Sequence, residues 1–274
     1  DLIVYYPMDE LSGGTIYDNS SYMRNGTLMN TVDNDTVHLG ENPIGSGGSL
    51  DFDGSNDYID TDYIFSGSQI SFSTWVKLKD TPSTDFVFGT LNNTAPYYGY
   101  GFYFDSNTDI IWYNYNGSNN GIVNYDAGIQ VGQWYHYAGT FNGTHYALYI
   151  NGSLIVTNAS TFFVQPTDID MFVGARHDRT DPDDAHANIT IDEFMIFNRS
   201  LTDAEVLLLY NGTSTFSESM GCTFSDNQTM SEDLDCVDLT ISSGGVLDAN
   251  GYSINATGDV DITGTLHGRT GDHW

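Results

Sequence analysis

The stretch QWYHYAGTFNGTHYALYINGSL, from Gln133 to Leu154, decides the fold class of this chain. Strands are expected at 135–141, 145–150 and 153–157, because these runs are rich in aromatic and apolar side chains and are bounded by turn residues. Asn142-Gly143 and Asn151-Gly152 separate the runs, and Asn-Gly supplies the two positive-φ positions of a type I′ turn. The stretch therefore predicts two consecutive β-hairpins.

Short strands separated by turns also precede these hairpins. In SFSTWVKL, from Ser71 to Leu78, Phe72 and Val76 alternate with Trp75 and Lys77, as in a strand whose two faces differ. The aromatic content of 14% and the 29 glycines are typical of a β-sandwich. Further strands are expected at Leu2 to Tyr6, Ser49 to Phe52 and Asp57 to Ile59.

One short helix is expected near residue 205. Thr202-Asp203-Ala204-Glu205 has the spacing of a capping box, in which the threonine hydroxyl caps the helix and the glutamate reaches back. Gly212 is expected to end the helix. Its apolar side is predicted to consist of Val206, Leu208, Leu209 and Tyr210.

Seven motifs, in their order and spacing, resemble the laminin G-like, concanavalin A-like jelly-roll family of lectins and glucanases. They are LIVYYPMDE (2–10), TIYDNSSYMRNGTL (15–28), GGSLDFDGSNDYID (47–60), ISFSTWVKL (70–78), QWYHYAGTFNGTHYALYINGSL (133–154), MFVGAR (171–176) and ITIDEFMIFNRSLTDAEVLLLY (189–210). The resemblance covers residues 1–212. It implies an all-β fold, a jelly-roll sandwich of two antiparallel sheets with one short C-terminal helix.

Residues 213–274 form a second, β-rich segment with a different pattern. Runs of about five residues alternate with Gly or Asn corners, which resembles the start of a parallel β-helix, or β-solenoid. Such a unit needs further coils or a partner to bury its apolar face. The alternative is a small β-hairpin appendix. The residues expected to face inward are Leu239, Ile241, Val246, Leu247, Ile254, Val260, Ile262 and Leu266.

The two cysteines, Cys222 and Cys236, both lie in this C-terminal segment. Their spacing matches no usual zinc pattern, and no histidine pair accompanies them. In an extracellular setting a disulfide is expected between them. By loop entropy it would contribute about 3 kcal/mol.

Thirteen Asn-x-Ser/Thr sequons are spread over the whole chain. Each is an acceptor pattern for N-linked glycan, which requires a surface position. The pattern predicts a heavily glycosylated extracellular or cell-surface protein, although a composition rich in Asn, Ser and Thr also generates sequons. They begin at Asn19, Asn25, Asn34, Asn92, Asn116, Asn142, Asn151, Asn158, Asn188, Asn198, Asn211, Asn227 and Asn255.

The charge of the chain excludes whole classes of partner. With 7 Lys and Arg against 37 Asp and Glu, the formal net charge is −30. Nucleic-acid binding requires a cationic surface, and anionic membranes are disfavoured for the same reason. Such a field attracts cations such as Ca²⁺, or it serves solubility alone. No run is apolar and long enough for membrane insertion.

The family resemblance implies a structural Ca²⁺ where the first strand, the loop after it and the last strand meet. Mapped by motif, the ligands would be Asp9, Asp18, Asn25 and Asp192. Carboxylates from remote segments together with carbonyl oxygens suit this ion. The alternative is that Asp9 and Asp18 cap turns. Asn25 also begins a sequon, which conflicts with a buried ligand role.

Catalysis is not expected. Retaining glycosidases need two carboxyl groups about 5 Å apart, and the carboxylate pattern of the related glucanases is absent. Asp192 and Glu193 are adjacent, so on a regular strand they point to opposite faces. The seven histidines form no HxH or HxxxH cluster. The sequence therefore predicts a binding or structural protein.

A carbohydrate site is predicted on the aromatic hairpin YYGYGFYF and IIWYNYN. Sugar rings stack on aromatic faces while amides hydrogen-bond to hydroxyls, and the candidates are Tyr98, Tyr100, Trp112 and Asn114. The alternative is that most of these rings belong to the core.

Three functions are considered, and the third, a fragment of an extracellular hydrolase, is disfavoured because the carboxylate pair is absent. The first is a lectin-like module of a surface protein, which binds glycans or other surface proteins and serves adhesion. The second is a structural subunit of an extracellular filament, sheath or surface layer, in which the C-terminal segment joins copies of the chain.

Overall fold

The computed structural model describes two compact units, Leu2–Gly212 and Thr213–Trp274 with Asp1. In the first, the described residues are 2–10, 12–29, 37–39, 41–44, 47–92, 98–105, 109–115, 120–126, 128–161, 163, 168–178 and 185–212. In the second they are 1, 222–224, 227–229, 234–236, 239–241, 243–244, 246–248, 254–256, 260–263 and 265–267.

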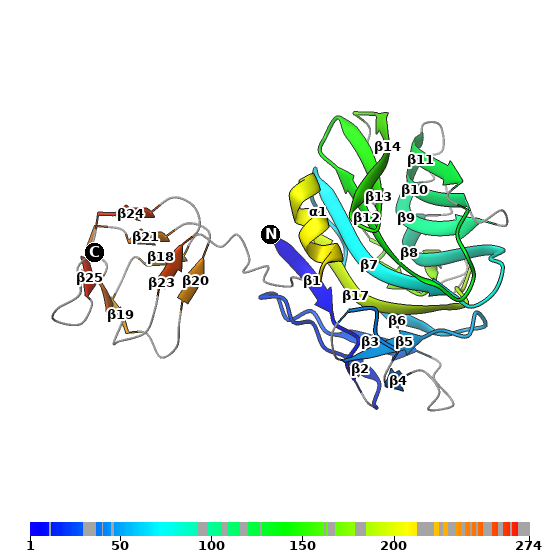
Figure 1. Ribbon diagram of the computed structural model, residues 1–274, viewed down its shortest axis with the longest axis horizontal. Helices are drawn as coiled ribbons and strands as arrows, with labels where there is room; N and C mark the ends of the chain where they lie inside the picture. Colours follow the sequence, from blue (N-terminus) through cyan, green and yellow to red (C-terminus); the bar gives the residue numbers. More distant parts are fainter. Residues whose placement is uncertain are drawn as a thin grey trace. The chain divides into compact units, whose positions relative to one another are not determined.

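The first unit consists of two sheets packed face to face (Figure 1). Sheet A has the order β14-β13-β12-β7-β17-β5-β4, with β1 paired to β17, and all its pairs are antiparallel. Its strands are β1 (Leu2–Tyr6), β4 (Val37–Leu39), β5 (Gly48–Asp51), β7 (Ile70–Leu78), β12 (Trp134–Phe141), β13 (His145–Ile150), β14 (Ser153–Ala159) and β17 (Ile189–Phe197).

Sheet B has the order β11-β10-β9-β8-β15-β6-β3-β2. It is antiparallel except that β16 pairs with β8 in parallel. Its strands are β2 (Thr15–Ile16), β3 (Gly26–Met29), β6 (Tyr58–Asp60), β8 (Thr84–Asn92), β9 (Tyr98–Asp105), β10 (Asp109–Tyr115), β11 (Asn120–Asp126), β15 (Phe172–Val173) and β16 (Arg176–Asp178). The two antiparallel sheets confirm the expected jelly-roll sandwich.

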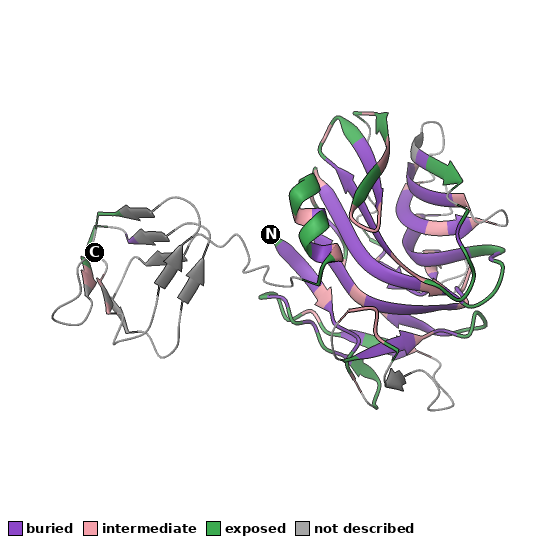
Figure 2. Ribbon diagram, viewed as in Figure 1, coloured by how far each residue is buried: buried purple, intermediate pink, exposed green. Residues whose placement is uncertain are grey.

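Aromatic rings from both sheets fill the core. Most buried residues of this unit lie on the strands of the two sheets (Figure 2). Phe72 on β7 packs against Phe102 and Trp112 of sheet B, with ring centroids 4.7 Å and 5.1 Å away. The ring centroid of Phe88, also in sheet B, lies 5.0 Å from that of Phe72. These contacts join the two sheets because each ring projects from the inner face of its own sheet.

The predicted hairpin strands are confirmed as β12, β13 and β14, which pair in that order. Asn151 and Gly152 both have positive φ, 48° and 74°, as a type I′ turn requires. The side chain of Asn151 also accepts a hydrogen bond from the backbone N–H of His136 at 2.9 Å. This bond attaches the tip of one hairpin to the neighbouring strand.

The turn at Asn142 differs from the prediction. Only Gly143 has positive φ there, at 93°, so the turn is not type I′. Asn142 Oδ1 instead accepts hydrogen bonds from the backbone N–H groups of Thr144 and His145, at 3.0 Å and 2.9 Å. An asparagine side chain can therefore organise a turn in place of the expected backbone conformation.

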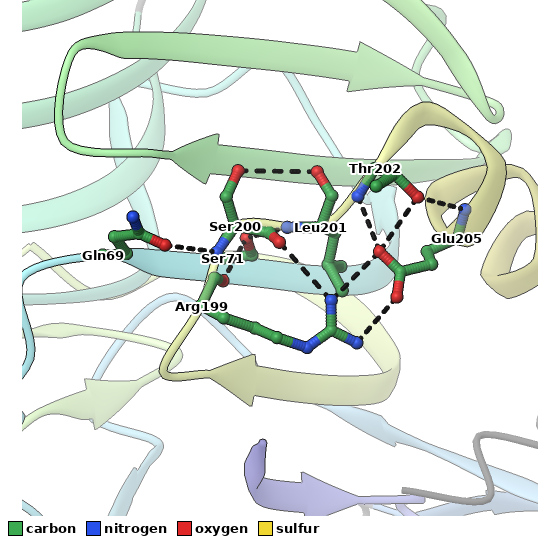
Figure 3. A network of polar contacts seen from close by, with 7 residues as sticks. All are labelled: Gln69, Ser71, Arg199, Ser200, Leu201, Thr202 and Glu205. Atoms are coloured by element: carbon green, nitrogen blue, oxygen red, sulfur yellow. Dashed lines mark hydrogen bonds and ion pairs between the residues drawn. The ribbon is translucent and has the colours of Figure 1, made fainter. Parts of the chain in front are cut away.

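The helix α1 (Asp203–Tyr210) begins with the predicted capping box. Thr202 Oγ1 accepts from the N–H of Glu205, and Glu205 Oε2 accepts from the N–H of Thr202 at 2.7 Å. Arg199 pairs with the same glutamate at 2.8 Å, so the cap belongs to a larger polar network (Figure 3). That network includes Ser71 Oγ, which accepts from the N–H of Leu201.

The helix packs on the outer face of sheet A through fewer residues than expected. Val206 and Leu209 are buried, and the Tyr210 ring stacks on Trp75 with centroids 5.5 Å apart. Leu208, expected on the apolar side, is 47% exposed, because it lies on the side of the helix away from Val206 and Leu209. No helix in the described part of the chain combines the length and the apolar character needed to cross a membrane.

Replacing Thr202 by Ala is expected to lower the free energy of unfolding by about 1 kcal/mol, because the N–H of Glu205 loses its acceptor. Urea denaturation followed by circular dichroism measures the change. Thr202→Ser keeps the oxygen and serves as the matched control. An equal loss in both variants would contradict a role for the hydroxyl.

In the second unit, strands pair in parallel in three small sheets. Cys222 pairs with Leu239, and Leu239 with Val260; Asn227 pairs with Val246, and Val246 with Thr265. The strands are β18 (Cys222–Phe224), β19 (Asn227–Thr229), β20 (Leu234–Cys236), β21 (Leu239–Ile241), β22 (Val246–Asp248), β23 (Ile254–Ala256), β24 (Val260–Ile262) and β25 (Thr265–His267). Cys222 and Cys236 lie on β18 and β20, but their side chains are outside the described part, so the disulfide stays a prediction.

Candidate functional site

The structure corrects the aromatic site predicted on β9 and β10. Trp112 and Asn114 are fully buried, and Tyr100 is 2% exposed. Trp112 and Tyr100 belong to the core between the sheets, so neither ring offers a face to a sugar. Tyr98 is half-buried at the start of β9. For Trp112 and Tyr100, the alternative that these aromatics pack inside the sandwich is therefore correct.

The opposite face of the same strands has its own aromatic cluster. Phe86 on β8 stacks on Tyr103 of β9, with centroids 4.6 Å apart, and Tyr113 of β10 packs edge-on against Tyr103 at 5.7 Å. This outer aromatic cluster consists of Phe86, Tyr103, Ile111, Tyr113 and Tyr115, with Ala185 packed against it. Tyr103 and Tyr115 are partly exposed, so they are the rings that a ligand can reach.

Two paired glycines explain why this face accommodates large rings. Gly89 on β8 lies opposite Gly101 on β9. A Cβ on Gly89 would come within 2.8 Å of the Phe86 ring, and one on Gly101 within 3.0 Å of the Tyr113 ring. The rings thus lie in the space that the glycines leave, and the outer side of YYGYGFYF is covered by neighbouring aromatics.

Arg176 brings positive charge to the outer aromatic cluster. Its guanidinium lies 5.0 Å from the centre of the Phe86 ring, and Nη2 is 3.6 Å from Asp178 Oδ2. Burial raises the pKa of the Tyr103 hydroxyl, Asp105 raises it further, and Arg176 opposes both. The cluster thus combines two partly exposed rings with a guanidinium at Phe86. Sugar rings stack on aromatic side chains, and sugar hydroxyls hydrogen-bond to polar and charged groups.

Two of the four predicted calcium ligands have other partners. Asp18 accepts four hydrogen bonds: Oδ1 from the N–H groups of Tyr5 and Ser20, and Oδ2 from the Ser20 hydroxyl and the N–H of Arg24. Asn25 Oδ1 accepts from the N–H of Asp18 at 3.0 Å. The structure thus brings Asp18 and Asn25 together, but as a loop anchor for β1.

The other two predicted ligands are Asp9, which follows β1 and bonds to β5, and Asp192 on β17. The charge of Asp9 acts on Asp192 electrostatically. Asp192 is fully buried; its Oδ1 accepts from the N–H of Glu193 at 2.9 Å, while Oδ2 has no partner among the described residues. Burial raises the pKa of Asp192 to about 9, and Glu193 and Asp9 contribute in the same direction. Asp9 Oδ1 accepts from the N–H of Gly48 at 2.7 Å.

A β-bulge shapes this acidic junction. The register of β17 against β7 shifts between Asp192 and Met195, and Glu193 has a φ of 53°. Regular alternation, on which the opposite-face expectation for Asp192 and Glu193 rested, therefore does not apply here. Glu193 Oε2 accepts from the Tyr5 hydroxyl at 2.6 Å. In the described part of the chain no three His, Cys, Asp or Glu side chains are grouped to hold a metal ion.

A second acidic group was not predicted. His177 Nδ1 lies 2.6 Å from Asp170 Oδ1. Burial and the neighbouring Asp170 raise the pKa of Asp60 to about 6. Burial also acts to raise the pKa of Asp170, but hydrogen bonds from His177 and Asp60 outweigh it and lower that pKa. The three residues come from remote segments, and their spacing in the sequence gave no signal.

A serine–histidine contact is present in sheet A, yet its surroundings are structural. Ser73 Oγ lies 2.9 Å from His136 Nε2, and both residues are buried. Burial lowers the pKa of His136 to about 3, so the imidazole is neutral. His136 Nδ1 has no partner among the described residues, and Tyr210 of α1 packs against the ring. The pair lacks the orienting third group of a catalytic triad.

Sequon asparagines in the described part of the chain are mostly accessible. Asn92 is the exception, since only 4% of it is exposed at the end of β8, and a glycan would not fit there in this fold. Asn34 and Asn116, and the side chains of Asn227 and Asn255, lie outside the described residues. Asn151 and Asn188 are half-buried. The exposed ones are Asn19, Asn25, Asn142, Asn158, Asn198 and Asn211.

The two-sheet sandwich with its terminal helix is a lectin-like jelly roll. A family model described as the concanavalin A-like lectin/glucanases superfamily, Laminin_G_3, matches residues 53–207, which is more than half of the chain. The chain belongs to this family. No curated protein sequence matches it.

Several solved structures share the fold at low sequence identity. The binding domain of Paraclostridial Mosquitocidal Protein 1 matches with a TM-score of 0.58 and 16% identity, over 82% of this chain and 54% of that one. Domain 4 of AbnA, an extracellular arabinanase from Geobacillus stearothermophilus, was solved with arabinotriose. It matches with a TM-score of 0.57 and 21% identity, over 77% of this chain and 98% of that one. The binding domain of Botulinum Neurotoxin DC, solved with SialylT, matches with a TM-score of 0.53 and 18% identity, over 82% of this chain and 53% of that one. The chain thus spans about half the length of the two toxin domains.

Proposed function

We propose that this protein is a non-catalytic, N-glycosylated module of the cell surface or extracellular space that binds carbohydrate through the outer face of sheet B. The observation that carries the proposal is the outer aromatic cluster, where Tyr103 and Tyr115 stay partly exposed. Arg176 lies beside the Phe86 ring of the same cluster, in a chain that has only 7 Lys and Arg. A saccharide is the ligand that uses both aromatic faces and charged hydrogen-bonding groups.

The structural relatives support a binding role. One was solved with arabinotriose and another with SialylT, and several are described as binding domains. The dense sequons support a location outside the cell, because N-glycan is attached to secreted and surface proteins. The partners proposed are therefore glycans or glycosylated surface proteins.

Replacing Tyr115 by Ala is expected to weaken carbohydrate binding about tenfold, because one stacking surface is lost. A glycan array first identifies the saccharide, and titration calorimetry then gives the dissociation constants. Tyr103→Ala should act in the same direction. Tyr115→Phe keeps the ring and separates stacking from hydrogen bonding by the hydroxyl.

Tyr17→Ala is the matched control, because Tyr17 is 58% exposed and is not part of the outer aromatic cluster. Thermal unfolding of each variant shows whether the fold is retained. Unchanged binding in folded Tyr115→Ala and Tyr103→Ala would remove this face as the site. No binding to any saccharide on the array would remove the lectin function.

The C-terminal unit supports a second candidate, a structural subunit that assembles through a β-solenoid-like segment. Strands β23, β24 and β25 each pair on one side only among the described residues, which leaves backbone groups that a further strand can satisfy. Polymers seen by electron microscopy of the full chain, together with no saccharide binding, would favour this candidate over the lectin. A monomer at all concentrations would contradict it.

A structural Ca²⁺ is proposed at Asp9 and Asp192, with backbone carbonyls and water completing the coordination. Asp192 Oδ2, which is buried and has no partner among the described residues, supports the proposal, because a cation would compensate the charge of the carboxylate once its proton is lost. Asp18 and Asn25 are left out, because both Asp18 oxygens and Asn25 Oδ1 accept hydrogen bonds, whereas Asp192 Oδ2 has no partner among the described residues. When bound, Ca²⁺ would link the first strand to the last.

A further inference from the structure

Exposed strand edges invite pairing with other chains, and most edges of this sandwich are protected. The strand β2 has two residues, and β4 and β16 have three each. The edge strand β11 ends at Asp126, which lies opposite Asp109. The free side of β1 is occupied, because its Tyr5 N–H donates to Asp18 Oδ1 and its Tyr5 carbonyl accepts from the N–H of Asn19.

The edge strand β14 differs from these edges. Helix α1 and strand β11 lie close to it, but no described strand pairs with its outer side. It is seven residues long, SLIVTNA, with no charged residue and no proline, although the chain contains 37 acidic residues. Among the described residues it pairs with β13 alone. Leu154 is 46% exposed, and Ile155 and Val156 are half-buried. Long, uncharged and apolar edges of this kind promote edge-to-edge association.

Sequons lie at both ends of this strand. Asn158 is on β14 itself and is exposed, and Asn151 is in the turn that leads into it. We propose that Asn158 is an N-glycosylation site whose glycan covers the edge of β14 and prevents pairing with a second copy of the chain. A large hydrophilic group on the strand excludes a neighbouring backbone, as a charge or a proline does on other edges.

The modification transfers an oligosaccharide from a polyisoprenoid diphosphate donor to the Asn158 amide. The bond between the sugar C1 and Nδ2 forms, the bond between C1 and the phosphate oxygen breaks, and the lipid diphosphate leaves. The amide proton passes to a base of the transferase. The inference rests on the proposed glycosylation of the chain and is independent of saccharide binding by sheet B.

The test compares the full chain produced in a host that N-glycosylates with Ser160→Ala, which removes the sequon but keeps Asn158. Peptide mass mapping measures occupancy, and sedimentation velocity measures self-association. We expect Asn158 to be occupied, and Ser160→Ala to strengthen self-association at least about tenfold. Ser21→Ala removes the Asn19 sequon, away from β14, and should leave the protein monomeric.

A second variant keeps the test decisive if Ser160 itself matters for folding. Adding Leu154→Lys to Ser160→Ala places a charge on the same edge and should restore the monomer. Occupied sequons elsewhere with a bare Asn158 would overturn the inference alone, whereas no occupied sequon would overturn the proposed glycosylation as well. Monomeric Ser160→Ala, or association that Leu154→Lys does not relieve, would overturn the role of the edge.

Discussion

Asp192→Asn is expected to flatten the loss of stability that the wild-type protein shows as pH rises without Ca²⁺. Burial holds the folded-state pKa of Asp192 at about 9, against 3.8 for an unperturbed group. Between these values the folded protein keeps a proton that the unfolded chain has lost, so the free energy of unfolding falls with pH. This group contributes at most about 1.4 kcal/mol per pH unit.

Urea denaturation of both proteins at intervals from pH 4 to pH 9, in chelator, measures the effect. Asn keeps the amide oxygen that accepts from the N–H of Glu193, so the bulge should persist. Asp53→Asn, on an exposed loop, is the matched control and should follow the wild type. Parallel pH profiles for Asp192→Asn and the wild type would show that Asp192 does not hold this proton.

The wild type, Asp192→Asn and a third protein, Asp9→Asn, test the calcium proposal. At pH 8, added Ca²⁺ should raise the thermal midpoint of the wild type by stabilising ionised Asp192, because a ligand that binds only the folded state stabilises it. Asp192→Asn and Asp9→Asn should respond weakly. An equal shift in all three proteins would place any bound Ca²⁺ elsewhere.

Trp112→Ala is expected to lower the free energy of unfolding by about 3–5 kcal/mol. The ring is fully buried, with centroids 5.1 Å from Phe72 and 5.9 Å from Tyr146, so its removal opens a cavity between the sheets. The affinity for the saccharide, measured below the unfolding transition, should stay within about twofold of the wild type.

Denaturant unfolding and calorimetry of the same sample separate the two effects. Tyr17→Ala, an exposed aromatic substitution, should change stability by less than about 0.5 kcal/mol. A Trp112→Ala protein of normal stability that no longer binds saccharide would contradict the core assignment. It would reinstate the site predicted from the sequence.

The local elements of the fold could be predicted because their causes lie in neighbouring residues. The hairpin strands around Asn151-Gly152 follow from turn chemistry, and α1 begins where Thr202 and Glu205 can bond to each other's backbone. The turn at Asn142 was predicted with the wrong conformation. There the side chain bonds to two backbone N–H groups, which the Asn-Gly pattern does not reveal.

The candidate site could not be predicted to the same extent. Alternation in YYGYGFYF separates two faces but does not say which one meets the other sheet. Phe72 and Phe88 decide this, because they fill the inner side against Trp112. The cluster that remains on the outer face also needs Phe86 from β8 and Arg176 from β16, which lie outside that stretch.

The sequence by itself determined the all-β class, the hairpins, the helix cap and the family, because these depend on local periodicity, turn residues and the order of motifs. Only the tertiary structure decided which aromatic rings are accessible and that Asp192 is a buried acid in a bulge. It also showed that no described strand pairs with the outer side of β14. The physical reason is that burial, pKa and edge exposure arise from contacts between segments far apart in the chain, and these exist only once the two sheets have packed.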